Sequence, residues 1–523
     1  MATIQPKPVM LEQTGFLFAL PRELRDLIYE FYLAVEGGYV FNPNTARLVT
    51  ANNNNALIDL ALAYTCKLAA AEMHNLGLKV NAINFFTVFS DEKRSTIGRF
   101  QSIYKAYTDV EQGLLSLAGP WIDEEIFRQI EDSYPQFIGL LYVIKRGGIC
   151  INSTTNTSWG EVPSLFRAFI SKTLRLVSHN PGYCRAVSDS LFMSWVSPHL
   201  HEFLSFSHPA WVVPTEVILD DMRRTTRLNF MYPEYSMREK YRLSATSTAL
   251  NYITSLSPEV FSSIRKIVLH ENHTSICWPE SHAQYMIPMC RRNPNLRIEQ
   301  RVGLWMNVWP ASSDRITTLL GNDYATLSSD GLHVLHSGNT TRPSLAPWIM
   351  ETLALPSLGM PPDTFKLVFD GEVIDNITSR VLEDSELTSR VFAVTQRDAA
   401  WQGVFEEFGI SQDVIAGSST WQQMIGNQSY IMRGFPEAIR DITEGSSPLI
   451  SCNFKVGSSW NTEELQSESF TWSLHQWEEQ WLDNHTETFS TDPFLPEWLS
   501  IRLEDVVPGG DDLGDDEEAL NLG

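Results

Sequence analysis

The residues that suit metal binding best are two histidines and two cysteines, His270, His273, Cys277 and Cys290. Imidazole nitrogen and thiolate sulfur are preferred ligands of tetrahedral zinc, and a His-x2-His-x3-Cys spacing at the end of a strand brings such ligands together. Against zinc, Cys290 falls on the apolar side of an expected helix, where free cysteine packs as a small apolar residue. The spacing also matches no common zinc finger or ribbon. We therefore predict no metal and no cofactor.

Motifs of known catalytic chemistry are missing from the sequence, including G-x-G-x-x-G, the P-loop, G-x-S-x-G and H-E-x-x-H. His201-Glu202 begins like the last of these, but Ser205 stands where the second histidine ligand belongs. Cys66 and Cys150 have no neighbouring group that would orient either thiol as a nucleophile. We expect a protein that is not an enzyme, and the alternative is an enzyme with an unrecognised pocket.

The N-terminal segment Phe16–Leu33 carries the most informative apolar pattern of the chain. Pro21 suits the start of a helix because its φ angle is already helical, and the lead-in Phe16–Leu20 is continuously apolar. The apolar residues then recur at the spacing of one helix face, at Leu24, Leu27, Ile28, Phe31 and Tyr32. The pattern alone favours an ordinary core helix whose apolar stripe is buried.

The same segment resembles a known family. Leu20-Pro21-x-Glu23-Leu24-Arg25-x-x-Ile28-Tyr29 resembles the opening of fungal F-box-like proteins, and Glu23-Leu24-Arg25 is similar to a fungal domain with paired E-x-R motifs. Tyr64-Thr65-Cys66-Lys67 stands at the place of the second F-box helix, but the Trp that usually follows and the second E-x-R are missing. The resemblance covers about Phe16–Phe89. It implies docking on the Skp adaptor of a cullin-based ubiquitin ligase through Leu20, Pro21, Leu24, Leu27 and Ile28.

A further interpretation stays open beside such a substrate receptor and an enzyme with an unrecognised pocket. The chain is alternatively a stand-alone fungal regulatory or scaffold protein, in which the helix belongs to the core and an acidic-aromatic tail binds partners. For that tail we favour a purely structural role, in which its tryptophans pack back onto the body. Exposure of Leu24 and Ile28 distinguishes the interpretations, because a buried stripe cannot dock an adaptor.

Composition narrows the class of protein. The 523 residues include 43% apolar residues, enough for two to four folded domains. No apolar run is long enough to span a membrane, the N-terminal residues lack the basic region and continuous apolar region of a secretory signal, and the six cysteines are scattered, so we expect a cytoplasmic or nuclear location. From Asn461 to Gly523 there are 17 acidic residues and one arginine, which leaves a charge of about −8 of the total −24 for the remainder. We therefore expect protein partners, no nucleic acid and no membrane.

The expected fold is helix-rich α+β, with an F-box-like helical module followed by a mixed α/β body. A helix is expected at Leu57–Leu76, closed by Gly77, and a strand at Val80–Phe89. Alternating helix-like and strand-like segments in 246–309 predict a β-α-β unit with a short parallel sheet. The turn pair Asp370-Gly371 predicts a hairpin, and the composition of 312–362 predicts loops. The expected divisions are an F-box-like module at 1–92, a helical domain at 93–240, a mixed region at 241–400, a Trp-rich acidic region at 401–507 and a disordered tail at 508–523.

Overall fold

The computed structural model describes residues 16–52, 56–147, 159–228, 239–311, 335–371, 385–408, 430–486, 488–489, 501 and 504–507. A seven-stranded sheet in the order β2-β1-β3-β4-β5-β7-β8 lies at its centre. β1 and β2 form an antiparallel pair, and the other neighbours are parallel. The strands are β1 Tyr39–Asn42, β2 Arg47–Thr50, β3 Ala82–Phe86, β4 Lys266–Glu271, β5 Arg297–Gly303, β7 Phe365–Asp370 and β8 Ile450–Cys452, with β6 Leu335–His336 and β9 Thr488–Phe489 in a separate small pair.

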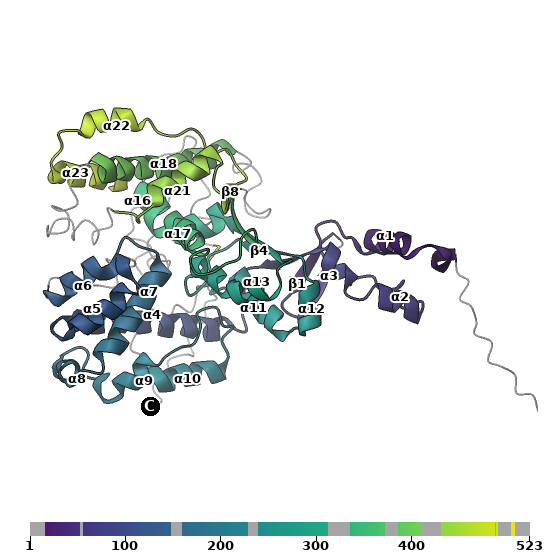
Figure 1. Cartoon of the computed structure of the whole chain (residues 1–523), viewed down its shortest axis with the longest axis horizontal. Coiled ribbons are helices and arrows are strands. Elements are labelled where there is room, and N and C mark those ends of the chain that lie inside the picture. The colour runs from purple at the N-terminus through teal and green to yellow at the C-terminus, as the bar shows by residue number, and fades with distance from the viewer. Residues whose placement is uncertain are drawn as a thin grey trace, which may run out of the picture.

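Helices make up most of the described chain (Figure 1). The N-terminal module contains α1 Arg22–Leu33, α2 Lys67–Glu72 and α3 Leu76–Val80. The connection from β3 to β4 holds α4 Arg94–Ser116, α5 Glu124–Glu131, α6 Ile138–Lys145, α7 Pro163–Val177, α8 Pro181–Asp189, α9 Leu200–Leu204, α10 Glu216–Thr226, α11 Ala245–Ser255 and α12 Pro258–Ser263. Later helices are α13 Ile287–Arg292, α14 Trp309–Ala311, α16 Ser337–Thr340, α17 Ala346–Ala354, α18 Ser385–Phe408, α21 Phe435–Glu444, α22 Thr462–Ser469 and α23 Leu474–Thr486.

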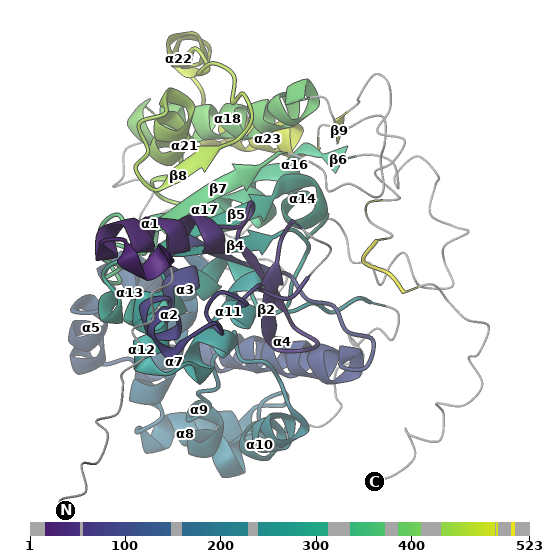
Figure 2. The ribbon, with the colours of Figure 1, turned by 90° about the vertical axis from the view of Figure 1, so that its right-hand side faces the viewer.

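The parallel strands β1, β3, β4, β5, β7 and β8 follow one another across the sheet in chain order. Parallel crossovers are right-handed, so a sheet that grows in one direction carries its connecting helices on one face. Ile267 and Leu269 of β4 accordingly lie in the core with residues of α11 and α17, whereas Lys266 and His270 alternate to the other side. We call that other side the open face, and Figure 2 views the strands from it.

The helical segment α4–α10 has a hydrophobic core of its own. Aromatic side chains dominate it, among them Phe137, which stacks on Phe169 with ring centroids 4.7 Å apart. The start of α5 is fixed by a side-chain cap: the Asp123 carboxylate accepts a hydrogen bond from the Ile126 backbone N–H at 2.9 Å. This segment is inserted in the crossover between β3 and β4 without interrupting the parallel pairing of those two strands.

Three tryptophans of the acidic C-terminal region, Trp472, Trp477 and Trp481, pack back onto the body. Trp477 and Trp481 of α23 are buried against Trp401 and Phe405 of α18, with Trp477 and Trp401 rings in an edge-to-face contact at 5.7 Å. The structural role that we favoured for these tryptophans is therefore confirmed. Residues 508–523, the predicted disordered tail, lie outside the described residues.

Several expected elements were wrong. The predicted helix Leu57–Leu76 is divided, because Leu57 bridges to Val49 of β2 and Asn75 adopts a left-handed φ of 56° between α2 and α3. Gly77 lies inside α3 and does not close a helix. The predicted hairpin at Asp370-Gly371 is also wrong for β7, whose partners β5 and β8 are both parallel; residues 372–374 lie outside the described residues. α17 forms within the expected loop region 312–362.

The helix-rich α+β class is confirmed, and so is the parallel β-α-β unit, in which β4 and β5 pair in register from Lys266↔Arg297 to Glu271↔Val302. That unit belongs to a larger sheet than expected, since it continues through β3 into β1 of the N-terminal module. The strands thus join the module to the body, while α1 and α2 project from the body (Figure 1).

Candidate functional site

Helix α1 contacts the rest of the module mainly through one of its faces. Arg25, Tyr29 and Leu33, spaced four residues apart, point inward, and Tyr29 and Leu33 pack with Met73 in a small apolar cluster. The helix begins at Arg22, one residue later than the sequence suggested, so that Pro21 occupies the N-cap position and its carbonyl accepts the N–H of Arg25 at 3.2 Å.

The predicted apolar stripe lies on the outer face of α1. Leu24 is 46% exposed, Leu27 50% and Ile28 39%, and Phe31 further along the helix is 82% exposed. Pro21 is exposed and Leu20 half-buried at the start of the helix. The default expectation of a buried stripe was wrong, because the inward face uses Arg25, Tyr29 and Leu33 in its place. We call Leu24, Leu27, Ile28, Phe31 and Tyr32 the outer stripe.

More apolar side chains are exposed in the neighbouring segment 57–68. The Leu62 N–H donates to the Tyr32 hydroxyl at 3.4 Å, which places this segment beside the C-terminal half of α1. The exposed side chains there are Leu57, Leu60, Tyr64 and Leu68. The module therefore exposes apolar side chains from both α1 and the segment 57–68, an arrangement that is typical of a protein-binding surface.

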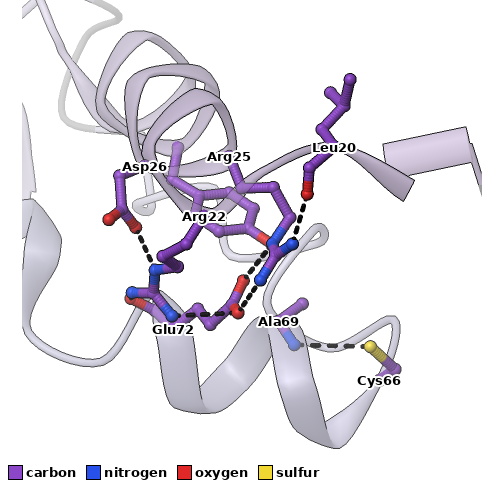
Figure 3. A network of polar contacts seen from close by, with 8 residues as sticks. Leu20, Arg22, Arg25, Asp26, Cys66, Ala69 and Glu72 are labelled. Carbon is purple, nitrogen blue, oxygen red and sulfur yellow. Dashed lines mark hydrogen bonds and ion pairs between the residues drawn. The ribbon is translucent and has the colours of Figure 1, made fainter. Parts of the chain in front are cut away.

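A buried carboxylate fixes the orientation of α1 (Figure 3). Glu72, at the end of α2, has a side chain that is only 4% exposed. Arg25 donates to it twice, from Nε at 3.0 Å and from Nη2 at 2.6 Å. Arg22 Nη1 lies 2.9 Å from the same carboxylate, and the buried Tyr29 hydroxyl donates to it at 2.9 Å. We call these four residues the Glu72 clamp.

The electrostatics of the clamp agree with its geometry. Hydrogen bonding from Arg25, helped by Tyr29 and by the charge of Arg22, lowers the pKa of Glu72 to about 2 although desolvation opposes this. Burial, with the hydrogen bond to Glu72, raises the pKa of Tyr29 to about 12. The carboxylate is thus ionised and the phenol neutral at physiological pH. A bidentate Arg–carboxylate pair holds two elements in one relative orientation.

A second polar anchor holds the other end of α1. Asn81, buried just before β3, accepts the N–H of Val35 at 2.8 Å and donates to the carbonyls of Leu33 and Gly77 at 2.8 and 2.9 Å. Since Asn81 leads directly into β3, α1 has a fixed position relative to the sheet. The outer stripe is therefore presented on a helix that is pinned at both ends.

Glu72 is the functional residue that sequence reasoning missed. The second E-x-R motif was judged absent, and no role was given to a glutamate 47 residues from its arginine. One signal was present, because Glu72 is the only acidic residue in the Ala-rich segment Lys67-Leu-Ala-Ala-Ala-Glu72. Ala69 and Glu72 form the buried side of this helix, and a carboxylate in such a position needs a cationic partner.

The predicted zinc candidates are not brought together. Cys277 belongs to the core of the helical segment and Cys290 to the core of the sheet. The His270 ring stacks on Phe86 with centroids 4.3 Å apart, and His273 lies 3.4 Å from the Thr87 hydroxyl. Among the described residues, no group of three or more His, Cys, Asp and Glu side chains is placed to hold a metal.

One serine–histidine contact has the geometry of a nucleophile and base. Ser244 Oγ lies 2.8 Å from His282 Nδ1, and His282 Nε2 lies 2.8 Å from the Cys277 carbonyl. Both side chains are buried, at 0% and 1% exposure, and Ser244 caps α11 by accepting the Ser247 N–H at 2.9 Å. The cavities that open on the sheet and on α18 are lined by other residues. We assign this contact to the folding of α11.

None of the helices in the described ranges combines the length and apolar character that crossing a bilayer requires. No family model, curated protein or solved structure matches this chain. Function is therefore inferred from its residues and their geometry.

Proposed function

We propose that this chain is a non-enzymatic, cytoplasmic or nuclear protein-interaction protein, a substrate receptor in which the N-terminal module docks the Skp adaptor of a cullin-based ubiquitin ligase. The single observation that carries the proposal is the exposure of the outer stripe on a projecting helix. Full burial of a leucine side chain favours association by roughly 1.5–3 kcal/mol, so Leu24, Leu27 and Ile28 can supply a substantial docking energy.

Two features support this proposal over its alternatives. A stand-alone interaction tail would need exposed aromatic residues to bind a partner. In the acidic C-terminal region, Trp477 and Trp481 are instead buried against the body. The parallel strands follow chain order without reversal, so the sheet formed by the described residues has no topological switch point of the kind at which α/β enzymes bind ligands. Both features therefore favour a non-enzymatic receptor over a protein with an interaction tail and over an enzyme.

Leu24→Asp is expected to weaken capture of the Skp adaptor by about tenfold or more, because it removes an apolar contact and forces a carboxylate into the interface. The measurement is binding of purified full-length chain to immobilised adaptor. Leu24 is 46% exposed, so the variant is expected to keep the wild-type circular dichroism spectrum and thermal midpoint.

Leu191→Asp is the matched control, since Leu191 is 91% exposed and far from the module in the sequence. It should bind the adaptor like the wild type. A wild-type chain that does not bind the adaptor, or a Leu24→Asp variant that binds it normally, contradicts the proposed docking.

A further inference from the structure

The open face of the sheet carries an ordered set of cations. Its residues alternate with the buried ones along β4, β5 and β7. Across neighbouring strands, the register places Lys266 beside Arg297, Glu299 beside Lys366 and His270 beside Arg301. Neighbouring strands are about 4.8 Å apart, so the four cations Lys266, Arg297, Arg301 and Lys366 occupy one strip over three strands, which also contains Glu299 and His270.

Glu299 offsets only part of this positive charge. Its carboxylate lies 3.0 Å from Lys266 Nζ and 2.6 Å from Arg301 Nε. Within the described residues, no acidic side chain pairs with Arg297 or Lys366. Asp370, the other carboxylate of this face, stands at the opposite end of β7 and accepts from Asn453 Nδ2 at 2.7 Å. The strip is positive, although the chain as a whole carries −24.

A cavity of about 430 Å³ lies over the β4 and β5 part of this strip, and Arg297 and Lys366 lie outside its lining. Lys266, His270, Glu299 and Arg301 contribute to its floor, and the α1–β1 turn together with residues 80–82 forms its wall. Asn84 Nδ2 holds that turn by donating to the Gly37 carbonyl at 2.8 Å. The cavity thus lies between the N-terminal module and the sheet. A peptide segment bound in it would contact both.

The His270 ring in the floor is hydrogen-bonded and neutral. Asn84 Nδ2 donates to backbone carbonyls, so its Oδ1 accepts from His270 Nε2 at 3.0 Å and leaves His270 Nδ1 as an acceptor. Burial, with the charge of Arg301, lowers the pKa of His270 to about 4. The positive charge of the face at neutral pH therefore comes from lysine and arginine.

We propose that the open face binds an extended acidic segment of the target protein, with Asp or Glu carboxylates pairing with Arg301, Lys266 and Lys366. Alternate side chains of an extended peptide are about 6.6 Å apart. This spacing lies between the separations of strand positions one and two strands apart, about 4.8 and 9.6 Å, a difference that long lysine and arginine side chains can span. Charge complementarity selects an acidic partner, and Glu299 within the strip disfavours the continuous phosphates of nucleic acid. This inference rests on the proposed role as a target receptor and names the chemistry of the target.

The test measures fluorescence anisotropy of a labelled twelve-residue Asp/Glu-rich peptide titrated with the full-length chain. We expect saturable binding that weakens as salt is added. Lys366→Glu should weaken it by about fivefold, since it replaces an attraction by a repulsion without breaking an ion pair. Arg185→Glu makes the same charge change on an exposed residue of α8 and should leave binding unchanged. Absence of binding, or equal effects of both variants, overturns the proposal.

A second variant tests whether the open face binds a segment of the target or the acidic C-terminal segment of this chain. Deletion of 508–523 removes six acidic residues and should leave peptide affinity unchanged. Binding that appears only after this deletion identifies the C-terminal segment as the occupant and overturns a target segment. The peptide assay contains no adaptor, so failure of adaptor docking with retained peptide binding contradicts only the ligase role.

Discussion

Glu72→Ala is expected to release α1 from α2 and to lower the local stability of the N-terminal module by about 3 kcal/mol. Removing one partner of a buried ion pair leaves the other charge desolvated and unpaired. Here Arg25, whose side chain is 14% exposed, loses both hydrogen bonds to the carboxylate, and the fully buried Tyr29 hydroxyl loses its acceptor. The cost falls on α1 because the clamp joins α1 to α2.

Hydrogen exchange of the Tyr29 and Leu33 amides measures this local opening. Trypsin provides a second measurement, since cleavage after Arg22 and Arg25 requires α1 to unfold. Glu23→Ala is the matched control, because Glu23 lies on the same helix but is exposed. If Glu72→Ala keeps wild-type protection of these amides, the clamp does not hold α1.

The clamp also predicts a dependence on acid. The pKa of Glu72 is lowered from 4.5 to about 2 in the folded chain. Its stabilising contribution is therefore fully present above pH 4.5 and is lost as the pH falls toward 2. Protection of the Tyr29 amide should fall through that window in the wild type. Glu72→Gln, which carries no charge, should show weaker protection at pH 7 and no such fall.

Adaptor capture provides a functional measurement of the same change. Glu72→Ala changes no residue of the outer stripe. It should nevertheless weaken capture of the adaptor, because the released α1 must become ordered again when it binds. The effect differs from that of Leu24→Asp, which should remove the contact without loosening the helix. A Glu72→Ala variant with mobile α1 and normal capture would show that docking does not need the clamp.

The sequence predicted where helix α1 forms, but it did not predict which face of the helix is buried. Helix α1 was expected from its periodicity and from Pro21, and it forms. Periodicity identifies an apolar stripe but does not say whether the stripe faces in or out, and here Arg25 and Tyr29 take the inner face. Their partner Glu72 is far away in the sequence, where spacing rules for one helix give no information.

Sheet order was beyond what the sequence could predict. The β4–α13–β5 unit was recognisable because strand-like and helical segments alternate along this part of the sequence. The partners of this unit, β3 on one side and β7 on the other, join it across the inserted helices α4–α10 and across 304–364. Since pairing over such separations is set by the whole core, the open face with Lys266 and Lys366 could not be predicted.

The second large effect concerns Glu111, a buried carboxyl group of α4 in the helical segment. Only 5% of the residue is exposed, and the Tyr107 hydroxyl donates to its Oε1 at 3.0 Å. Burial raises the pKa of Glu111 from 4.5 to about 7. The folded chain therefore retains a proton that the unfolded chain has released between pH 4.5 and 7, so the contribution of this group to stability falls as the pH rises through that window.

Glu111→Gln is expected to equal the wild type near pH 5 and to exceed it by about 2–3 kcal/mol at pH 8, because the glutamine amide carries no charge and its oxygen still accepts from Tyr107. Urea unfolding at the two pH values measures the difference between variant and wild type, which cancels the titration of other groups. Glu131→Gln, at an exposed position of α5, should show no pH-dependent difference. Equal destabilisation of Glu111→Gln at both pH values would mean that the hydrogen bond outweighs the buried charge.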